Sequence, residues 1–339
     1  MALQPETGIS QNTNNVKRKR VNWLSRFGGA IVRSRPLMLI ILIVLLSAYM
    51  LYWYPISFPT FSNISAVLLN ASQDSILVVG MMILMIGGQF DLSIGGILAL
   101  SGVVTGVLIA QVGLSTPLAV LIGLAVGAFT GLVNGFAVTK LRINALIATL
   151  ATQGIFYGVT QLISGTGVSP IGTGFAKLGQ TFIIGFESPF WVMLVVVVLG
   201  SLAVSKTRFF RQYYFIGGND RAAKLSGIKV EKVTMIGFVL MGLLAALSGI
   251  LGAARLNAAV VSAGIGVELN VITAAVLGGA SLKGGEGVVI GGVLGVIFID
   301  LVQNALIIMG VGVFWQNIII GLVLLFAVSF DRLKSQNRV

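Results

Sequence analysis

The chain consists largely of apolar runs about 20 residues long, separated by short polar or glycine-rich segments. A helix needs about 20 apolar residues to cross a bilayer, and these runs lack the strict alternation that a membrane β-barrel requires. Only 9% of the residues are charged, against about 25% in soluble domains. The sequence therefore predicts an all-α polytopic membrane protein.

We expect about ten transmembrane helices. The third and eighth are the least secure, because flanking glycines allow them to be short, broken or re-entrant. The expected organisation is a basic N-terminal tail at 1–36, a transmembrane domain at 37–330 and a C-terminal tail at 331–339. The ten apolar windows are Leu37–Tyr54, Ile64–Gly87, Ile94–Gln111, Pro117–Thr139, Asn144–Ser164, Pro189–Ser205, Val233–Ala254, Val267–Ala280, Val288–Gly310 and Val313–Phe330.

The distribution of Lys and Arg tests this count, because these residues favour cytoplasmic loops. With ten spans, all 22 Lys and Arg residues except Lys177 and Arg255 fall on the side of the two tails. We therefore expect both termini, and the loop at 206–232, to be cytoplasmic. This topology explains the net charge of +12 without a nucleic-acid partner. No small-residue cleavage site follows the first run, which we interpret as a retained signal anchor.

The longest polar interruption, IGGNDRAAKLSGIKV at 216–230, contains the signals of a short helix. Asn219 or Asp220 can cap its start, and Gly227 suits the left-handed position after its last turn. We predict about two turns, with Ala222 and Leu225 on one face that docks into a groove of a cytoplasmic partner. The alternative is an ordinary solvated loop helix. The residues assigned to this docking are Asn219, Asp220, Ala222, Ala223, Leu225, Gly227 and Ile228.

Two windows carry glycines at four-residue spacing, which places them on one helix face. They are Gly123, Gly127, Gly131 and Gly135 in the fourth window, and Gly287, Gly291 and Gly295 in the ninth. We interpret both rows as seams of close helix packing. Their offset of five windows indicates two five-helix halves that could be related as an inverted repeat.

Few ionisable groups lie within the apolar runs, where charges are costly and usually functional. Asp74 follows Asn70 by one turn, and Asp300 precedes Asn304 by one turn. Asp91 lies in the glycine-flanked segment between the second and third windows. We assign these five residues to a translocation path. The alternative is that each carboxylate is a partnered structural group, and for Asp91 a helix cap.

The chain has no cysteine and no histidine, and it lacks a phosphate-binding loop in which glycines precede Lys and Ser or Thr. These absences exclude a Cys nucleophile and the commonest zinc ligands. We therefore expect no enzymatic activity, no metal and no cofactor in this chain.

Three stretches together resemble the permease subunits of ATP-binding-cassette importers for ribose and related monosaccharides. They are GGQFDLSIGGILALSG at 87–102, IGGNDRAAKLSGIKV at 216–230 and GVELNVITAAVLGGASLKGGEG at 266–287. Their order and spacing agree over 37–330. Gln89, Val261 and Val267 depart from the family pattern, which leaves the identity of the sugar open.

The resemblance implies a permease dimer, homomeric or heteromeric, in a bacterial inner membrane. Two cytoplasmic ATPase subunits would bind ATP and Mg²⁺ and push the helix at 219–228, and an extracytoplasmic sugar-binding protein would deliver the substrate. We assign Arg255, Glu268 and Lys177, on the external side, to contact with that protein. The alternative function is a secondary transporter driven by an ion gradient, with Asp74, Asp91 and Asp300 as coupling sites.

Overall fold

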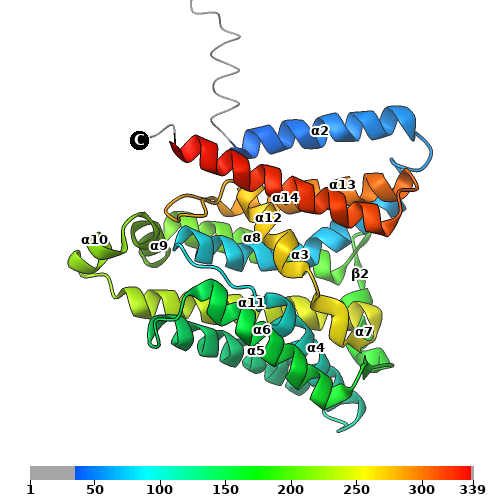
Figure 1. Cartoon of the computed structure of the whole chain (residues 1–339). Coiled ribbons are helices and arrows are strands. Elements are labelled where there is room, and N and C mark those ends of the chain that lie inside the picture. The colour runs from blue at the N-terminus through cyan, green and yellow to red at the C-terminus, as the bar shows by residue number, and fades with distance from the viewer. Residues whose placement is uncertain (1–34, 337–339) are drawn as a thin grey trace, which may run out of the picture. The chain divides into compact units, whose positions relative to one another are not determined.

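The computed structural model describes residues 35–336, so residues 1–34 of the predicted basic tail (1–36) and residues 337–339 lie outside the described part (Figure 1). The long and short apolar helices are α2 (Arg35–Trp53), α3 (Phe61–Ile86), α4 (Ile94–Ala110), α5 (Thr116–Thr139), α6 (Ala145–Ser164), α8 (Ser188–Lys206), α11 (Val230–Leu256), α12 (Val267–Leu277), α13 (Val289–Ile308) and α14 (Val313–Gln336). The connecting elements are α7 (Thr173–Gln180), α9 (Arg208–Gly218), α10 (Asp220–Leu225), the 3₁₀ turn η1 (Val261–Gly264), and two short antiparallel ribbons, β1 (Gly167–Val168) with β4 (Ala259–Val260) and β2 (Phe182–Ile183) with β3 (Phe186–Glu187).

Within residues 35–336, seven helices are long and apolar enough to cross a membrane: α2, α3, α5, α6, α8, α11 and α13. Three shorter apolar stretches accompany them, Ile94–Ala110, Val261–Leu277 and Val313–Val323. The prediction of an all-α polytopic membrane protein is confirmed, while the number of ten spans stays a prediction. The third and eighth windows are short helices, and α12 has only 11 residues because η1 interrupts the apolar stretch before it. Towards the C-terminus, α14 continues past the predicted end at Phe330 to Gln336.

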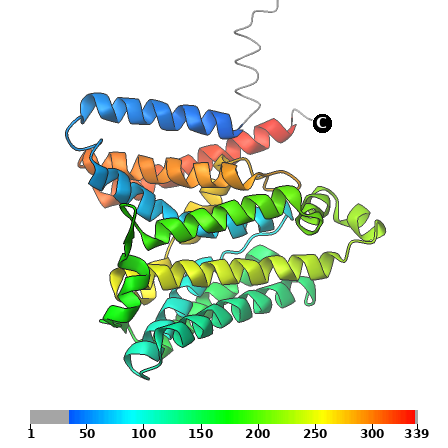
Figure 2. The ribbon, with the colours of Figure 1, turned by 180° about the vertical axis from the view of Figure 1, so that it is seen from behind.

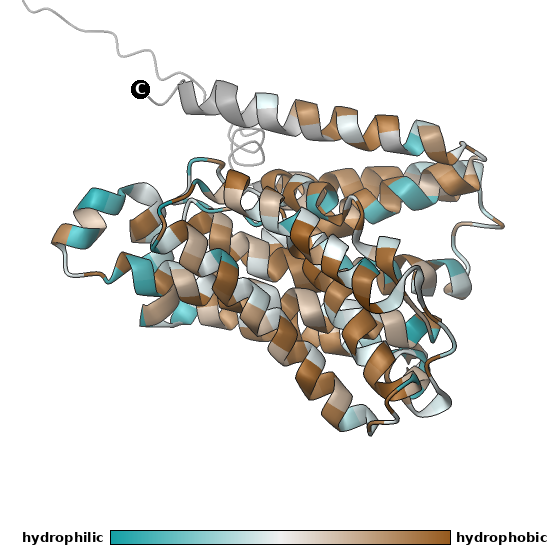
Figure 3. Cartoon of the chain, turned by 60° about the horizontal axis from the view of Figure 1, so that its bottom comes forward, coloured by the Kyte–Doolittle hydropathy of each residue, from teal (hydrophilic) through white to brown (hydrophobic). Residues whose placement is uncertain are grey.

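The interior of the bundle is built on α3 and α11. Every residue of α3 from Ser75 to Ile86 is buried. The outer helices α2, α5, α6 and α8 instead expose large apolar side chains such as Leu45, Leu150 and Leu199. Apolar side chains on an outer face suit contact with lipid, where they replace the polar surface of a soluble protein. Figure 3 shows the same division, with hydrophobic residues along the helices and hydrophilic residues gathered mainly near their ends.

The predicted glycine seams are real helix contacts. A methyl group on Gly127 would overlap the Gly242 carbonyl oxygen and the Ala246 side chain of α11, and one on Gly131 would overlap the Phe238 carbonyl oxygen. In the other row, a methyl group on Gly295 would overlap the backbone of α12, and one on Gly291 would overlap the backbone of the residue directly after α12. Gly287 lies before α13 and not within it. Only residues without a side chain allow backbones to approach so closely.

One of the two seams joins the predicted halves of the chain, because the glycine row of α5 meets α11, whereas the row of α13 meets α12 within the second half. Helix α5 packs along α11, and α13 packs along α3, so each pair contains one helix from each predicted half. This reciprocal exchange is what two related five-helix halves would produce. The inverted repeat remains a prediction, supported by this pairing.

The bundle has two distinct ends, which Figures 1 and 2 show from opposite sides. Helices α9 and α10 project from one end, which we call the α10 end. The C-terminal end of α14 points the same way. Helix α7 and the β2–β3 ribbon lie at the opposite end, which also contains Arg255 and which we call the Arg255 end.

Candidate functional site

Helix α10 is the predicted docking helix, formed as its sequence indicates. The Asn219 side-chain oxygen accepts a hydrogen bond from the Ala222 N–H at 3.0 Å, so Asn219 and not Asp220 is the cap. Asp220 instead pairs with Lys224 at 2.7 Å, and Gly227 takes the left-handed conformation with φ 84°. Helix α10 has six residues, which agrees with the prediction of about two turns.

The side chains of α10 divide into a buried and an exposed set. Ala223 is only 3% exposed and packs into the core of its own chain, and the half-buried Ile228 packs beside that core. Leu225 is 90% exposed, and Ala222 is exposed as well. Singly exposed apolar side chains are common on protein surfaces, so this exposure makes Leu225 available to a partner without requiring one. Leu225 is therefore the docking candidate, whereas Ala223 holds α10 in place.

Helix α9 forms the base on which α10 stands, and the sequence analysis missed it. The Tyr213 hydroxyl donates to the Val233 carbonyl of α11 at 2.7 Å, and the Tyr214 hydroxyl donates to the Gly287 carbonyl at 2.8 Å. Burial raises the pKa of both tyrosines, so both remain hydrogen-bond donors at physiological pH. The repeat of aromatic residues at 209, 210, 213 and 214, after the cap Thr207, is the helical signal that identifies α9.

A cavity of about 620 Å³ opens beside α10. Its wall is formed by the segment after α3, the end of α5, the ends of α9 and α10, the start of α11 and the loop between α12 and α13. Arg142, Lys224 and Lys283 contribute positive charge to this wall, and Asp220 and Glu231 contribute negative charge. The cavity shows that segments far apart in the sequence converge at the base of α10.

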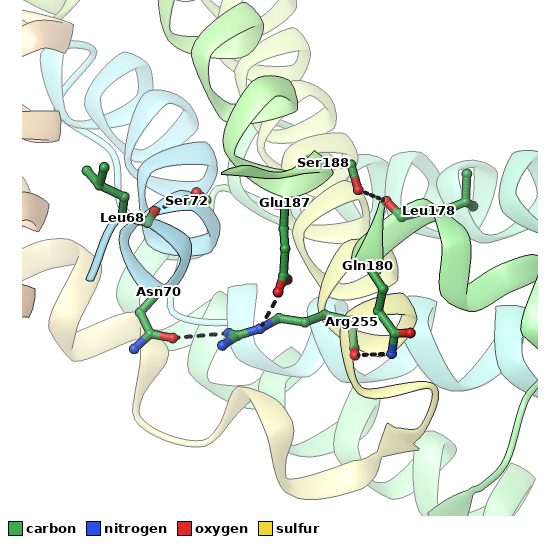
Figure 4. A network of polar contacts seen from close by, with 8 residues as sticks. All are labelled: Leu68, Asn70, Ser72, Leu178, Gln180, Glu187, Ser188 and Arg255. Atoms are coloured by element: carbon green, nitrogen blue, oxygen red, sulfur yellow. Dashed lines mark hydrogen bonds and ion pairs between the residues drawn. The ribbon is translucent and has the colours of Figure 1, made fainter. Parts of the chain in front are cut away.

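At the opposite end, Arg255 is the centre of a polar network (Figure 4). Its guanidinium donates to the Asn70 side-chain oxygen at 3.0 Å and lies 4.0 Å from the Glu187 carboxylate. Its backbone carbonyl accepts from the Gln180 side chain at 2.8 Å. The structure thus joins two predicted site residues, Asn70 of the path and Arg255 of the external surface.

A second cavity, of about 200 Å³, adjoins this network. Gln73 and Arg255 are its principal polar side chains, and the small residues of α4 and α11, such as Gly102 and Gly249, form much of the remaining wall. A space of this size with two long polar side chains at its edge suits a small polar solute.

Of the other two residues assigned to the external surface, Lys177 is exposed on α7 and Glu268 is not. Glu268 is half-buried at the start of α12, and its Oε2 faces Gly95 of α4 beside the Tyr157 hydroxyl of α6. Within residues 35–336, neither that oxygen nor the Tyr157 hydroxyl has a hydrogen-bond partner. The Glu268 carboxylate therefore faces the space between α4, α6 and α12, and not the external surface to which we assigned it.

Asp91 is a hydrogen-bonded carboxylate just before α4, whose N-cap residue is Ser93. It is fully buried and accepts hydrogen bonds from the Ser93 N–H at 2.8 Å and the Ser93 hydroxyl at 2.6 Å. The Asn134 amide lies 3.4 Å from Asp91 and donates to the Ser93 hydroxyl at 2.7 Å, and Thr152 donates to Asn134 at 2.7 Å. This network ties the segment before α4 to α5 and α6, which favours a partnered structural carboxylate; the assignment of Asp91 to the path stays a prediction.

The remaining path residues lie on the contact between α3 and α13. Asp74 of α3 lies within electrostatic range of Asp300 of α13, which is 8% exposed. No donor among the described residues reaches Asp300 Oδ2. Asn304 exchanges two side-chain hydrogen bonds with Asn63, at 2.7 and 3.2 Å, so it fastens α13 to the first turn of α3. Among the described residues, no cluster of three or more acidic, His or Cys side chains could hold a metal ion.

The comparisons with known proteins agree with this architecture. Residues 63–328 match the family described as the permease component of branched-chain amino acid transport systems. The chain belongs to this permease family. No solved structure matches the chain.

Among curated relatives of this permease, two types recur. The ribose import permease protein RbsC of Escherichia coli K12 is 38% identical over 285 residues, which cover 82% of this chain and 88% of the relative. The L-arabinose transport system permease protein AraH of the same strain is 39% identical over 281 residues, covering 83% and 85%. RbsC of Bacillus subtilis is 38% identical over 276 residues, covering 80% and 85%. The chain is therefore the membrane component of a transport system.

Several residues of this permease's two ends were missed at the level of sequence. Gln73 was passed over beside Asp74, although it lies in the same polar stretch NASQDS. Glu187 ends the short strand β3 in a connecting segment, where only the fold decides its partner. The aromatic pattern around Tyr213 was a usable signal, whereas no local pattern indicates the pairing of Asn63 with Asn304.

Proposed function

We propose that the chain is the permease subunit of an ATP-driven importer for a monosaccharide, a ribose-like pentose, a hexose or a related polyol. The observation that carries the substrate class is 38–39% identity, over about four fifths of the chain, to permeases named for ribose and L-arabinose. The small cavity lined by Gln73 and Arg255 is compatible with such a solute.

In this proposal ATP and Mg²⁺ bind to separate ATPase subunits in the cytoplasm, since this sequence has no phosphate-binding loop. The α10 end is then cytoplasmic, with both termini of the chain, in the inner membrane of a bacterium. Leu225 inserts into a groove of the ATPase subunit, and a second permease copy, identical or related, completes the pathway. Movement of α10 tilts the helices that meet at the glycine seams, because differential contacts in two states supply the coupling.

The test is uptake by proteoliposomes that contain the complete complex. We expect saturable uptake of labelled ribose or arabinose that stops when ATP is depleted and continues in the presence of an ionophore. Uptake of leucine or isoleucine in place of any sugar would contradict the substrate class. Uptake that survives ATP depletion and collapses with the ionophore would contradict the energy source and favour the ion-gradient alternative.

Charge reversal at Arg255 tests the opposite end, where an extracytoplasmic sugar-binding protein would dock. Arg255→Glu places a carboxylate beside Asn70 and Glu187, so it removes the hydrogen bond to Asn70 and adds repulsion. We expect stimulation of ATP hydrolysis by the sugar-loaded binding protein to fall about tenfold, equivalent to ~1.4 kcal/mol. ATP hydrolysis without the binding protein serves as the control for assembly. Unchanged stimulation in the variant would remove Arg255 from this role.

A further inference from the structure

Three glycine-rich segments meet at the base of α10, with backbone against backbone. They are the segment directly after α3 at Gly88, the last turn of α9 at Gly217, and the loop between α12 and α13 at Gly284 and Gly285. The Gly285 N–H donates to the Ile86 carbonyl of α3 at 2.8 Å. We call these four glycines the glycine junction.

The space around the junction leaves no room for a side chain on Gly217 or Gly284. A methyl group on Gly217 would overlap both the Ile86 carbonyl oxygen and the Gly285 nitrogen. One on Gly284 would lie 2.8 Å from the Gly217 Cα and 2.9 Å from the Gly88 Cα, which is closer than real Cβ contacts. Contacts between backbones cannot be relieved by a change of rotamer, so a displacement of one segment moves the others.

Helix α10 is separated from the junction by two residues. Asn219 caps α10, and Gly217 lies two positions before it. Beyond the junction, α3 runs through the interior to Asn70, which holds Arg255 at the opposite end. The distance along α3 from Ile86 to Asn70 is roughly 24 Å at 1.5 Å per residue. A buried, continuous helix thus connects the junction with the Arg255 network.

We propose that the glycine junction transmits the movement of α10 to α3 and to the loop before α13, and that Gly217 is its positioning residue. This inference rests on the proposed coupling of α10 to an ATPase. It goes further in naming the contact that passes movement into the membrane domain and the helix that receives it. Tyr214 adds a second link between α9 and the loop before α13, since its hydroxyl donates a hydrogen bond to the Gly287 carbonyl.

Two neighbouring glycines offer a matched comparison. Gly217 and Gly218 both lie in the last turn of α9, so alanine lowers backbone freedom in both by a similar amount. A methyl group on Gly217 meets α3 and the loop before α13, whereas one on Gly218 meets no atom of the described residues within 4 Å. The pair separates the contact at the junction from a simple need for flexibility.

The experiment measures sugar transported per ATP hydrolysed, in proteoliposomes with the ATPase subunits and the binding protein. We expect Gly217→Ala to lower this ratio at least tenfold and Gly218→Ala to stay within twofold of the unaltered protein. A ratio within twofold for Gly217→Ala, or an equal loss in both variants, would overturn the proposal.

A second measurement requires no variant. Hydrogen exchange of the unaltered complex, with and without bound ATP, should change together in 219–228, 86–88 and 284–287. A change confined to 219–228 would overturn transmission through the junction. The two proposals remain distinguishable: absence of any ATPase subunit from the purified complex contradicts the proposed function, whereas a coupled complex with an unaffected Gly217→Ala contradicts the junction alone.

Discussion

Leu225→Asp is expected to reduce sugar uptake at least a hundredfold while the permease still inserts and folds. Burying a leucine in a partner's groove contributes about 1.5–3 kcal/mol, and burying an unpaired carboxylate there costs several kcal/mol more. The sum exceeds ~3 kcal/mol, which corresponds to more than a hundredfold loss of affinity for the ATPase subunit. Because Leu225 is 90% exposed in the chain itself, the substitution removes almost no internal packing.

The measurement combines uptake with co-purification of the ATPase subunits through a tag on the permease. Leu225→Met keeps the apolar volume and should retain both, so it serves as the matched control. Ala223 would be an ambiguous target, because it is buried against its own chain and a larger residue there disturbs the base of α10. Normal uptake by Leu225→Asp would show that α10 does not dock through this side chain.

Gly127→Leu is expected to prevent stable folding of the membrane domain. Even a methyl group at Gly127 overlaps the Gly242 carbonyl and the Ala246 side chain of α11, and leucine adds three more carbons to the same space. Helices α5 and α11 would have to separate along their shared face, at a cost of about 3 kcal/mol or more. We expect little monodisperse protein in detergent, and a lower thermal midpoint for whatever is recovered.

The control for this prediction is Gly154→Leu in α6. Gly154 is exposed, and a methyl group there meets none of residues 35–336 within 4 Å, so the added side chain extends outward from the bundle. The two variants make the same chemical change within a transmembrane helix and differ only in the neighbour. Equal yield and thermal midpoint in both would contradict the assignment of Gly127 to a close-packed seam.

Local chemistry made much of the α10 end predictable. An Asn before a run of good helix formers and a Gly after it specify a short capped helix, and the structure confirms the cap at Asn219 and the left-handed Gly227. The seam glycines were predictable for a similar reason, since a four-residue period places them on one face. Which face of α10 is buried was not predictable, because only the packing of α10 against α9 and α11 decides that Ala223 turns inward.

The polar residues within the spans were predicted less well, for a physical reason. A carboxylate in an apolar run must find partners, but its partners come from helices distant in sequence. Asp91 found Ser93 nearby and Asn134 on α5, while Asn304 found Asn63 at the far end of the chain. Arg255 and Asn70 received separate roles from their positions and turned out to share a hydrogen bond.

The sequence by itself determined that this protein is a helical membrane permease, where its long apolar helices lie along the chain, which helix faces carry close-packing glycines and where the short polar helix begins. Those properties depend on hydropathy, spacing and capping, which act within one segment of about 20 residues. The tertiary structure decided which carboxylates are partnered, which residue of α10 is exposed, and that glycines at 88, 217, 284 and 285 meet at one point. Those properties depend on contacts between segments, and no single segment contains both sides of a contact.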